Sequence, residues 1–332
     1  MNRRSALLQG GALVSGVVVA AMTAGCAPAS NGRSASMQSA RVAPPDPPSA
    51  LFAALRAGAS GPPTVLALGE IHDNAVQHGL RLHWLQRLLE RGGHFSVAME
   101  QLDAANQSRI DALRAADAQA GRSTQARALA EAGGFSFEGW DWSLYEPVIA
   151  WALRHGLPVL GANLANAQTA SIARGQPHEL AQAQPAGWTD SDESSQRREI
   201  SDAHCGVLPA SVVPAMARAQ RARDATMAGA LQRALVAHRL PVVLLAGNGH
   251  VRRDLGVPRY LTGSGHAGPL LTVGFIERPA SSAPTVTADP SGLYDWRVLT
   301  AAQARPDPCV GLRERMGSRG RALIDRAPPV GQ

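Results

Sequence analysis

A carboxylate and an imidazole stand just after a short apolar run of strand length. The run at residues 65–68 is followed by Glu70 and His72. These two residues lie on the same face of an extended backbone because they are two positions apart. Apolar residues four positions apart then predict a helix over residues 74–91. Glu70 and His72 therefore stand at a strand-to-helix junction, where open α/β sheets bind ligands; the alternative is that both are solvated loop residues.

Polar residues also end three further predicted strands. Besides 65–68, apolar runs predict strands at residues 95–99, 158–161, 242–246 and 270–276. The first four are followed by Glu70 with His72, by Glu100, by Asn163, and by Asn248 with His250. The carboxyl ends of parallel strands lie at one edge of a sheet, so these tips predict one site.

Two histidines and two carboxylates form the candidate metal-ligating set, which consists of Glu70, His72, Glu100 and His250. Such a set can hold a divalent transition metal and leave positions open for water. A metal-bound hydroxide beside a carboxylate base is a hydrolytic arrangement. The set therefore favours a metal site, and with it a hydrolase, as one interpretation.

The predicted strands alternate with helical patterns, which indicates an α/β fold with a central, mainly parallel sheet and helices on both faces. Residues 50–164 and 241–315 are predicted to form this α/β domain. Residues 165–240 contain helical patterns only and are predicted to be a smaller helical insert. Residues 316–332 are a tail.

The N-terminus is predicted to be a targeting segment. Residues 1–25 combine a basic start with an apolar stretch and small residues before Cys26, as in a bacterial lipoprotein signal peptide. Acyl chains on Cys26 would anchor the mature protein to a membrane. Ala27 is not the Asp associated with inner-membrane retention, so the periplasmic face of the outer membrane is expected. Residues 26–49 read as a flexible tether.

Composition excludes several classes of function. The net charge is +6 and all 32 basic residues are arginine, which excludes a Schiff-base lysine and a Walker A loop. The arginines are scattered without interleaved aromatics, so nucleic-acid binding has no support. If Cys26 is lipidated, an oxidising compartment favours a Cys205–Cys309 disulfide, and two free buried thiols are the alternative.

Motifs along most of the chain resemble the ChaN-like haem-binding lipoprotein family. The matching segments are Gly69-Glu70-Ile71-His72-Asp73-Asn74, Ala98-Met99-Glu100, Trp140-Asp141-Trp142 with Tyr145, Ala162-Asn163-Leu164, His204-Cys205, Arg223-Asp224-Ala225-Thr226-Met227-Ala228, Ala246-Gly247-Asn248-Gly249-His250 with Arg253-Asp254, and Arg305-Pro306-Asp307-Pro308-Cys309. They run from about residue 55 to 313 in the family's order. The family lies in a superfamily with Tiki proteases, TraB-like proteins and erythromycin esterases.

The resemblance implies haem binding, with a tyrosine as iron ligand and histidine nearby, in a dimer that stacks two haems. Tyr145 lies inside a matched motif and is the first candidate ligand, and Tyr260 is the second. The histidines implicated in haem contact are His72, His78, His204 and His250. Family members often carry a His pair where this chain has Gln77-His78, so the first position of that pair is altered.

Arg252 lies two residues after His250 and could pair with a haem propionate, because arginine matches carboxylate geometry; the alternative is a solvated surface arginine.

Two hypotheses follow. The first is a lipid-anchored haem-binding protein of haem or iron uptake that is not an enzyme. It would form a homodimer, induced by haem, and would work with an outer-membrane haem or iron receptor. The alternative is a metal-dependent hydrolase, protease- or esterase-like, that uses the His/Glu site.

Overall fold

The computed structural model describes residues 43–62, 64–238, 240–279, 283–307, 309–310 and 313–314. The predicted signal peptide, the lipidation site Cys26 and the tail at 316–332 lie outside the described residues. Within the described part of the chain, no helix has the length and apolarity needed to cross a membrane.

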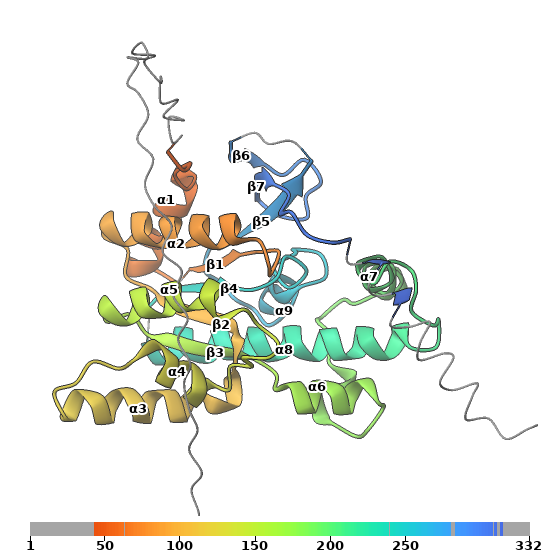
Figure 1. Ribbon diagram of the computed structural model, residues 1–332, viewed down its shortest axis with the longest axis horizontal. Helices are drawn as coiled ribbons and strands as arrows, with labels where there is room; N and C mark the ends of the chain where they lie inside the picture. The colour runs from red at the N-terminus through yellow and green to blue at the C-terminus, as the bar shows by residue number, and fades with distance from the viewer. Residues whose placement is uncertain are drawn as a thin grey trace, which may run out of the picture. The chain divides into compact units, whose positions relative to one another are not determined.

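A seven-stranded sheet forms the centre of the fold (Figure 1). Its strands are β1 (Val65–Leu68), β2 (Ser96–Asp103), β3 (Val159–Asn163), β4 (Val242–Leu245), β5 (Leu270–Arg278), β6 (Thr285–Ala288) and β7 (Trp296–Ala301). The spatial order is β3-β2-β4-β1-β5-β7-β6, and only the β6–β7 pair is antiparallel. The predicted α/β fold with a mainly parallel sheet is confirmed.

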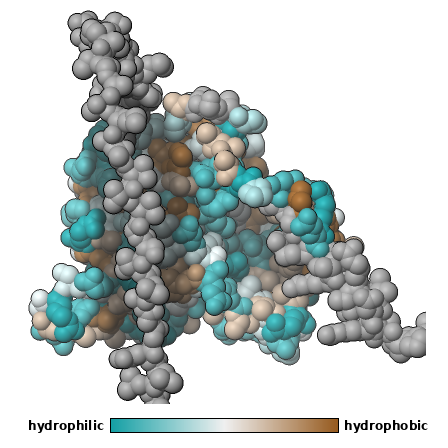
Figure 2. All heavy atoms as spheres, in the orientation of Figure 1, coloured by the Kyte–Doolittle hydropathy of each residue, from teal (hydrophilic) through white to brown (hydrophobic). Residues whose placement is uncertain are grey.

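Helices cover both faces because successive side chains of a buried strand point to opposite sides. Leu66 and Leu68 of β1 belong to one core, with residues of α1 (Ser49–Ser60), α2 (Ala75–Glu90), α4 (Ala126–Gly133) and α5 (Trp142–Arg154). Val65 and Ala67 belong to a second core, with residues of α8 (Val213–His238) and α9 (Val257–Gly263). Short η1 (Ala104–Asn106) and α3 (Gln107–Gln119) follow β2 and contact β3. Figure 2 shows hydrophilic residues along the outline of the molecule and hydrophobic residues nearer its middle.

The segment between β3 and β4 is helical. It contains α6 (Asn166–Ala173), η2 (Glu179–Gln182), α7 (Asp190–Ala203) and α8, and the first three pack against α8. α7 begins with a capping box in which Thr189 and Asp192 satisfy each other's backbone N–H groups. A disulfide joins Cys205, just after α7, to Cys309, as predicted.

Sequence patterns did not predict α1, β6 or β7. Ordered contacts also begin before residue 50: the Trp84 indole donates to the carbonyl of Pro45 at 2.8 Å, and Arg87 donates to Asp46 at 2.9 Å. The predicted tether at residues 26–49 therefore contributes its last residues to the packing against α2.

Candidate functional site

The candidate site lies at the carboxyl ends of three adjacent strands. β4 lies between β1 and β2, and Leu245 pairs with Leu68 on one side and Met99 on the other. Glu70, Gly247 and Glu100 come one or two residues after Leu68, Leu245 and Met99, respectively. The sheet register therefore brings three of the predicted polar tips together.

Glu70 is the most enclosed carboxylate of the site, with a side chain that is 0% exposed. Its Oε1 accepts from His72 Nδ1 and from the Tyr145 hydroxyl, each at 2.7 Å. Its Oε2 forms an ion pair with Arg81 of α2. A buried charge is tolerated when it is paired and hydrogen-bonded, and Glu70 meets both conditions.

His78 and Arg81 support Glu70 from α2. His78 Nε2 donates to the carbonyl of His72 at 3.0 Å, and its Nδ1 accepts from Arg81 Nη2 at 3.0 Å. Burial lowers the pKa of His78 to about 4, so its imidazole is neutral at pH 7. Burial also lowers the pKa of Arg81 to about 10, and its guanidinium stays charged.

A second buried array lies on the β2 side of the site. His250 donates from Nδ1 to Asp224 of α8 at 2.6 Å, and its Nε2 lies 3.3 Å from Glu100 Oε1. Glu100 Oε2 accepts from the backbone N–H of Gly247 at 2.7 Å. Arg223 lies 3.5 Å from Glu100 Oε1 and donates to Asn163, the polar tip of β3, at 3.1 Å.

Opposing effects set the protonation of this array. Burial opposes the charged form of His250, but Glu100 and Asp224 outweigh it and raise the pKa of His250 to about 9. Burial likewise opposes ionisation of Glu100, but His250 holds the pKa of Glu100 well below its usual value. At pH 7 the site therefore contains an imidazolium beside an ionised Glu100.

The two arrays meet at Gly247. A Cβ placed on Gly247 would lie 2.8 Å from His72 Cε1, 3.1 Å from His72 Nε2 and 3.5 Å from Glu100 Oε2. A side chain at position 247 would therefore displace the His72 ring from this position. The His72 side chain is 46% exposed and packs edge-on against Trp140, with ring centroids 4.7 Å apart. Partial desolvation of the ring lowers the pKa of His72.

The four predicted metal ligands thus form two contacting pairs, Glu70 with His72 and Glu100 with His250. Apart from His72 Nε2, their remaining polar atoms are occupied by Arg81, Tyr145, Asp224 and the Gly247 backbone. Among the residues that the structure describes, no three His, Cys, Asp or Glu side chains are grouped so that they could hold a metal ion.

A pocket of about 230 Å³ adjoins His250 where α7 and α8 meet the loop after β4. Its apolar lining includes Ile200, Ala203 and Leu255, and its polar lining includes His204, Arg252 and Asp224. His204 Nδ1 donates to the carbonyl of Ile200 at 2.7 Å. The pocket therefore brings together two predicted haem contacts, His204 and Arg252, and the carboxylate that holds a third, His250.

Arg252 is already engaged by two carboxylates. It donates to Asp254 at 2.9 and 2.8 Å, and its Nη1 lies 2.5 Å from Glu199. Glu199 is about half exposed. A haem propionate could reach Arg252 by taking the place of Glu199.

All three tyrosines are buried. Tyr145 is 1% exposed, and Tyr260 and Tyr294 are 8% exposed. Burial raises the pKa of each phenol, for Tyr294 to about 12. The Tyr145 hydroxyl donates to Glu70, and the Tyr260 hydroxyl has no hydrogen-bond partner within the described ranges.

Sequence reasoning assigned no role to Arg81 and Asp224. Asp224 lies beside Arg223 in one of the segments that resemble the family, and a lone acidic residue in the middle of a predicted helix is a signal for such a role. Arg81 carries no such signal, because its partner Glu70 is distant from it until α2 packs on the sheet.

Comparison with known proteins identifies the family and several solved structures that are similar to this chain. Residues 61–261 match the family model described as haem-binding uptake, Tiki superfamily, ChaN. The solved structure of ChaN of Campylobacter jejuni with cofacially bound haem is similar at a TM-score of 0.56 and 22% identity, over 72% of this chain and 88% of that one.

An erythromycin esterase, EreC, is similar at a TM-score of 0.36 and 17% identity, over 79% of this chain and 80% of that one. No curated protein matches the chain in sequence.

Proposed function

The chain belongs to the ChaN family of haem-binding uptake proteins in the Tiki superfamily, and we propose that it binds haem in the pocket between α7, α8 and the loop after β4. The hydrogen bond made by His204 is the observation that supports this location. Its Nδ1–H is held by the Ile200 carbonyl, so in the neutral imidazole the lone pair is on Nε2. A ring nitrogen fixed by a backbone acceptor is the usual support of a metal-ligating histidine.

The residues of this pocket fit a haem through an imidazole better than through a phenolate. Histidine is an established haem ligand, and tyrosine ligation requires a deprotonated phenol that reaches the iron. Each of the three phenols is buried with a raised pKa. We therefore assign iron ligation to His204, propionate pairing to Arg252, and contact with the macrocycle to Ile200, Ala203 and Leu255.

A bound haem would supply the iron and a large flat apolar surface. The chain's own residues would orient it: His250 is fixed by Asp224 and Glu100 and cannot turn toward the iron without losing both contacts. His250 does not itself line the pocket; its cation neutralises Asp224, the carboxylate that does.

The proposal includes a homodimer. The pocket of about 230 Å³ is smaller than the roughly 300–1,000 Å³ of pockets that bury most of a drug-sized ligand, so it can enclose only part of a haem. A second copy with its own haem would cover the remainder, and the related Campylobacter jejuni protein binds haem cofacially. Sedimentation of the protein with and without haemin tests this: a monomer in both states contradicts it.

We further propose a role in haem or iron uptake at a membrane surface, with the protein anchored through Cys26. The signal pattern before Cys26 and the family description support this role. An outer-membrane haem or iron receptor is the partner that such a position would serve. Mass analysis of the mature protein tests the anchor: an unmodified Cys26 contradicts it.

Haemin titration of the mature chain carrying Cys26→Ser tests the location of the site. A saturable Soret shift is expected, with His204→Ala weakening the binding and His72→Ala as the matched control that leaves it intact. Loss of binding in His72→Ala but not in His204→Ala would show that haem binds at the strand ends instead.

A second candidate function is hydrolysis at the strand ends, beside Gly247, where His72 and Glu100 approach each other. Glu70 holds His72 as Asp or Glu holds the base in hydrolytic triads, and His72 Nε2 faces the same space as Glu100. A neutral, half-exposed His72 can take a proton from water while the His250 cation stabilises negative charge. The geometry favours this metal-free arrangement over a divalent metal at Glu70, His72, Glu100 and His250, because these residues pair with one another and with Arg81, Tyr145 and Asp224. Metal analysis and ester or peptide hydrolysis assays of the wild type and His72→Ala test this, and equal hydrolysis rates in the two contradict it.

A further inference from the structure

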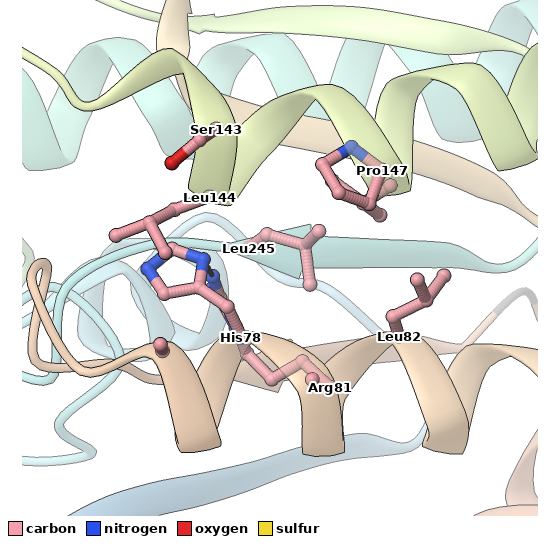
Figure 3. Close-up of a pocket in the computed structure, with 10 residues that line it drawn as sticks. His78, Arg81, Leu82, Ser143, Leu144, Pro147 and Leu245 are labelled. Atoms are coloured by element: carbon pink, nitrogen blue, oxygen red, sulfur yellow. Dashed lines mark hydrogen bonds between the residues drawn. The ribbon is translucent and has the colours of Figure 1, made fainter. Parts of the chain in front are cut away.

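A second pocket lies between α2 and α5, and His78 and Arg81 are among its lining residues. Its volume is about 260 Å³. Figure 3 shows Leu82 of α2 facing Leu144 and Pro147 of α5 across it, with Leu245 of β4 between the two helices. The walls are therefore largely aliphatic, and they belong to rigid helices rather than to loops.

Arg81 gives this apolar pocket a polar end. Its side chain is 3% exposed, and it is one of the residues that line the pocket. Nη2 is used by Glu70 and by His78 Nδ1, but Nε and Nη1 have no hydrogen-bond partner within the described part of the chain. Buried donors without an acceptor carry a free-energy cost that a ligand oxygen would remove.

Charge around Arg81 restricts the kind of ligand. Glu70 already neutralises the guanidinium, His78 is neutral, and Tyr145 remains a neutral phenol that donates to Glu70. A ligand carboxylate would be buried near the Glu70 carboxylate with no second cation to compensate it. A neutral acceptor can satisfy Arg81 without that penalty.

We propose that the cleft between α2 and α5 is a second binding site, for a small neutral molecule with an aliphatic body and one carbonyl oxygen that accepts from Arg81. Leu82, Leu144, Val148 and Leu245 contact the body. The site is distinct from the α7–α8 pocket, because the two pockets share no lining residue.

Gly79 offers a variant that closes this pocket without disturbing its chemistry. It lies on α2 among the lining residues, and a Cβ built on it meets no atom within 4 Å. A helical glycine also gains stability on replacement by most residues. Gly79→Phe should therefore fold and fill the pocket. Val76→Phe places the same ring on α2 at an exposed position that does not line the pocket, and it is the matched control.

The test uses hexanamide and hexanoate as probes, because they have the same shape and differ in charge. The mature chain with Cys26→Ser is titrated while the methyl resonances of Leu82, Leu144, Val148 and Leu245 are followed by NMR. Saturable shifts with hexanamide are expected, and Gly79→Phe should weaken binding about tenfold or more while Val76→Phe leaves it unchanged.

Three outcomes would overturn the proposal. Absence of saturable shifts with hexanamide would show that the pocket does not bind this class. Equal affinity in Gly79→Phe would place the binding elsewhere. Hexanoate binding as tightly as hexanamide would contradict the neutral character assigned to the ligand.

Discussion

The hydroxyl of Tyr145 donates to Glu70 Oε1 at 2.7 Å, and both side chains are buried. This relationship gives Tyr145 a structural role: it satisfies a carboxylate that also holds His72 and Arg81. A phenol in that position would have to lose its proton and abandon Glu70 before it could bind iron.

Replacing Tyr145 should therefore affect stability more than haem binding. Tyr145→Phe removes one hydrogen bond to a buried charge, and we expect the free energy of unfolding to fall by about 1–3 kcal/mol. The haem-bound absorption spectrum should stay the same. Urea denaturation and a haemin titration of the same preparation measure both quantities. Loss of a phenolate charge-transfer band, with unchanged stability, would instead identify Tyr145 as the iron ligand.

Arg81 should be among the most sensitive residues of the site. Arg81→Leu leaves Glu70 buried without its cation, and breaking a buried ion pair from one side costs about 3–5 kcal/mol. The matched control is Arg127→Ala, whose ion pair with Glu131 is exposed and contributes about 0.5 kcal/mol or less. Denaturant midpoints compare the two variants, and similar losses would show that the Glu70 pair is not buried as described.

The raised pKa of His250 predicts a loss of stability in alkali. The folded-state pKa is about 9 and the ordinary value is 6.5, so the stabilisation from protonated His250 is complete below pH 6.5 and is lost as pH rises toward 9. The free energy of unfolding, measured across this range, should fall. His250→Gln is expected to be less stable at pH 6 and to lack the part of the fall that His250 causes; an identical pH profile in the variant would refute the assignment.

The disulfide should couple the chain's C-terminal segment to the proposed haem pocket. Cys205 and Cys309 are 104 residues apart, and removal of such a link costs typically about 2–4 kcal/mol. Because His204 directly precedes Cys205, we expect Cys309→Ser to weaken haem binding as well as to lower the thermal midpoint. Haemin titration below that midpoint separates the two effects, and unchanged affinity would mean that α7 holds His204 without the disulfide.

Sequence patterns predicted the parts of the fold that are uniformly buried. The apolar runs that became β1, β2, β4 and β5 have interiors with almost no solvent exposure, so hydrophobicity alone marks them. β6 has a mostly exposed or half-buried pattern and pairs antiparallel with β7 at the edge of the sheet. Such an edge hairpin has no apolar run, so tertiary pairing rather than local sequence determines it.

The sequence predicts where the candidate site lies, but not which side chains pair with one another in it. Polar residues at the strand tips indicate Glu70, Glu100 and His250, since a parallel sheet places those tips at one edge. The partners Arg81 and Asp224 come from helices, and the face that each helix turns to the sheet depends on packing. The pairing of Glu70 with His72 rather than with a metal depends on those partners.

The central claim is that His204 ligates haem in the α7–α8 pocket, and resonance Raman spectroscopy of the reduced haem-loaded protein tests it most directly. The account predicts an iron–imidazole stretch that is present in the wild type and in Tyr145→Phe and is lost in His204→Ala. A tyrosinate signature in the oxidised protein that survives His204→Ala and disappears in Tyr145→Phe or Tyr260→Phe would contradict it.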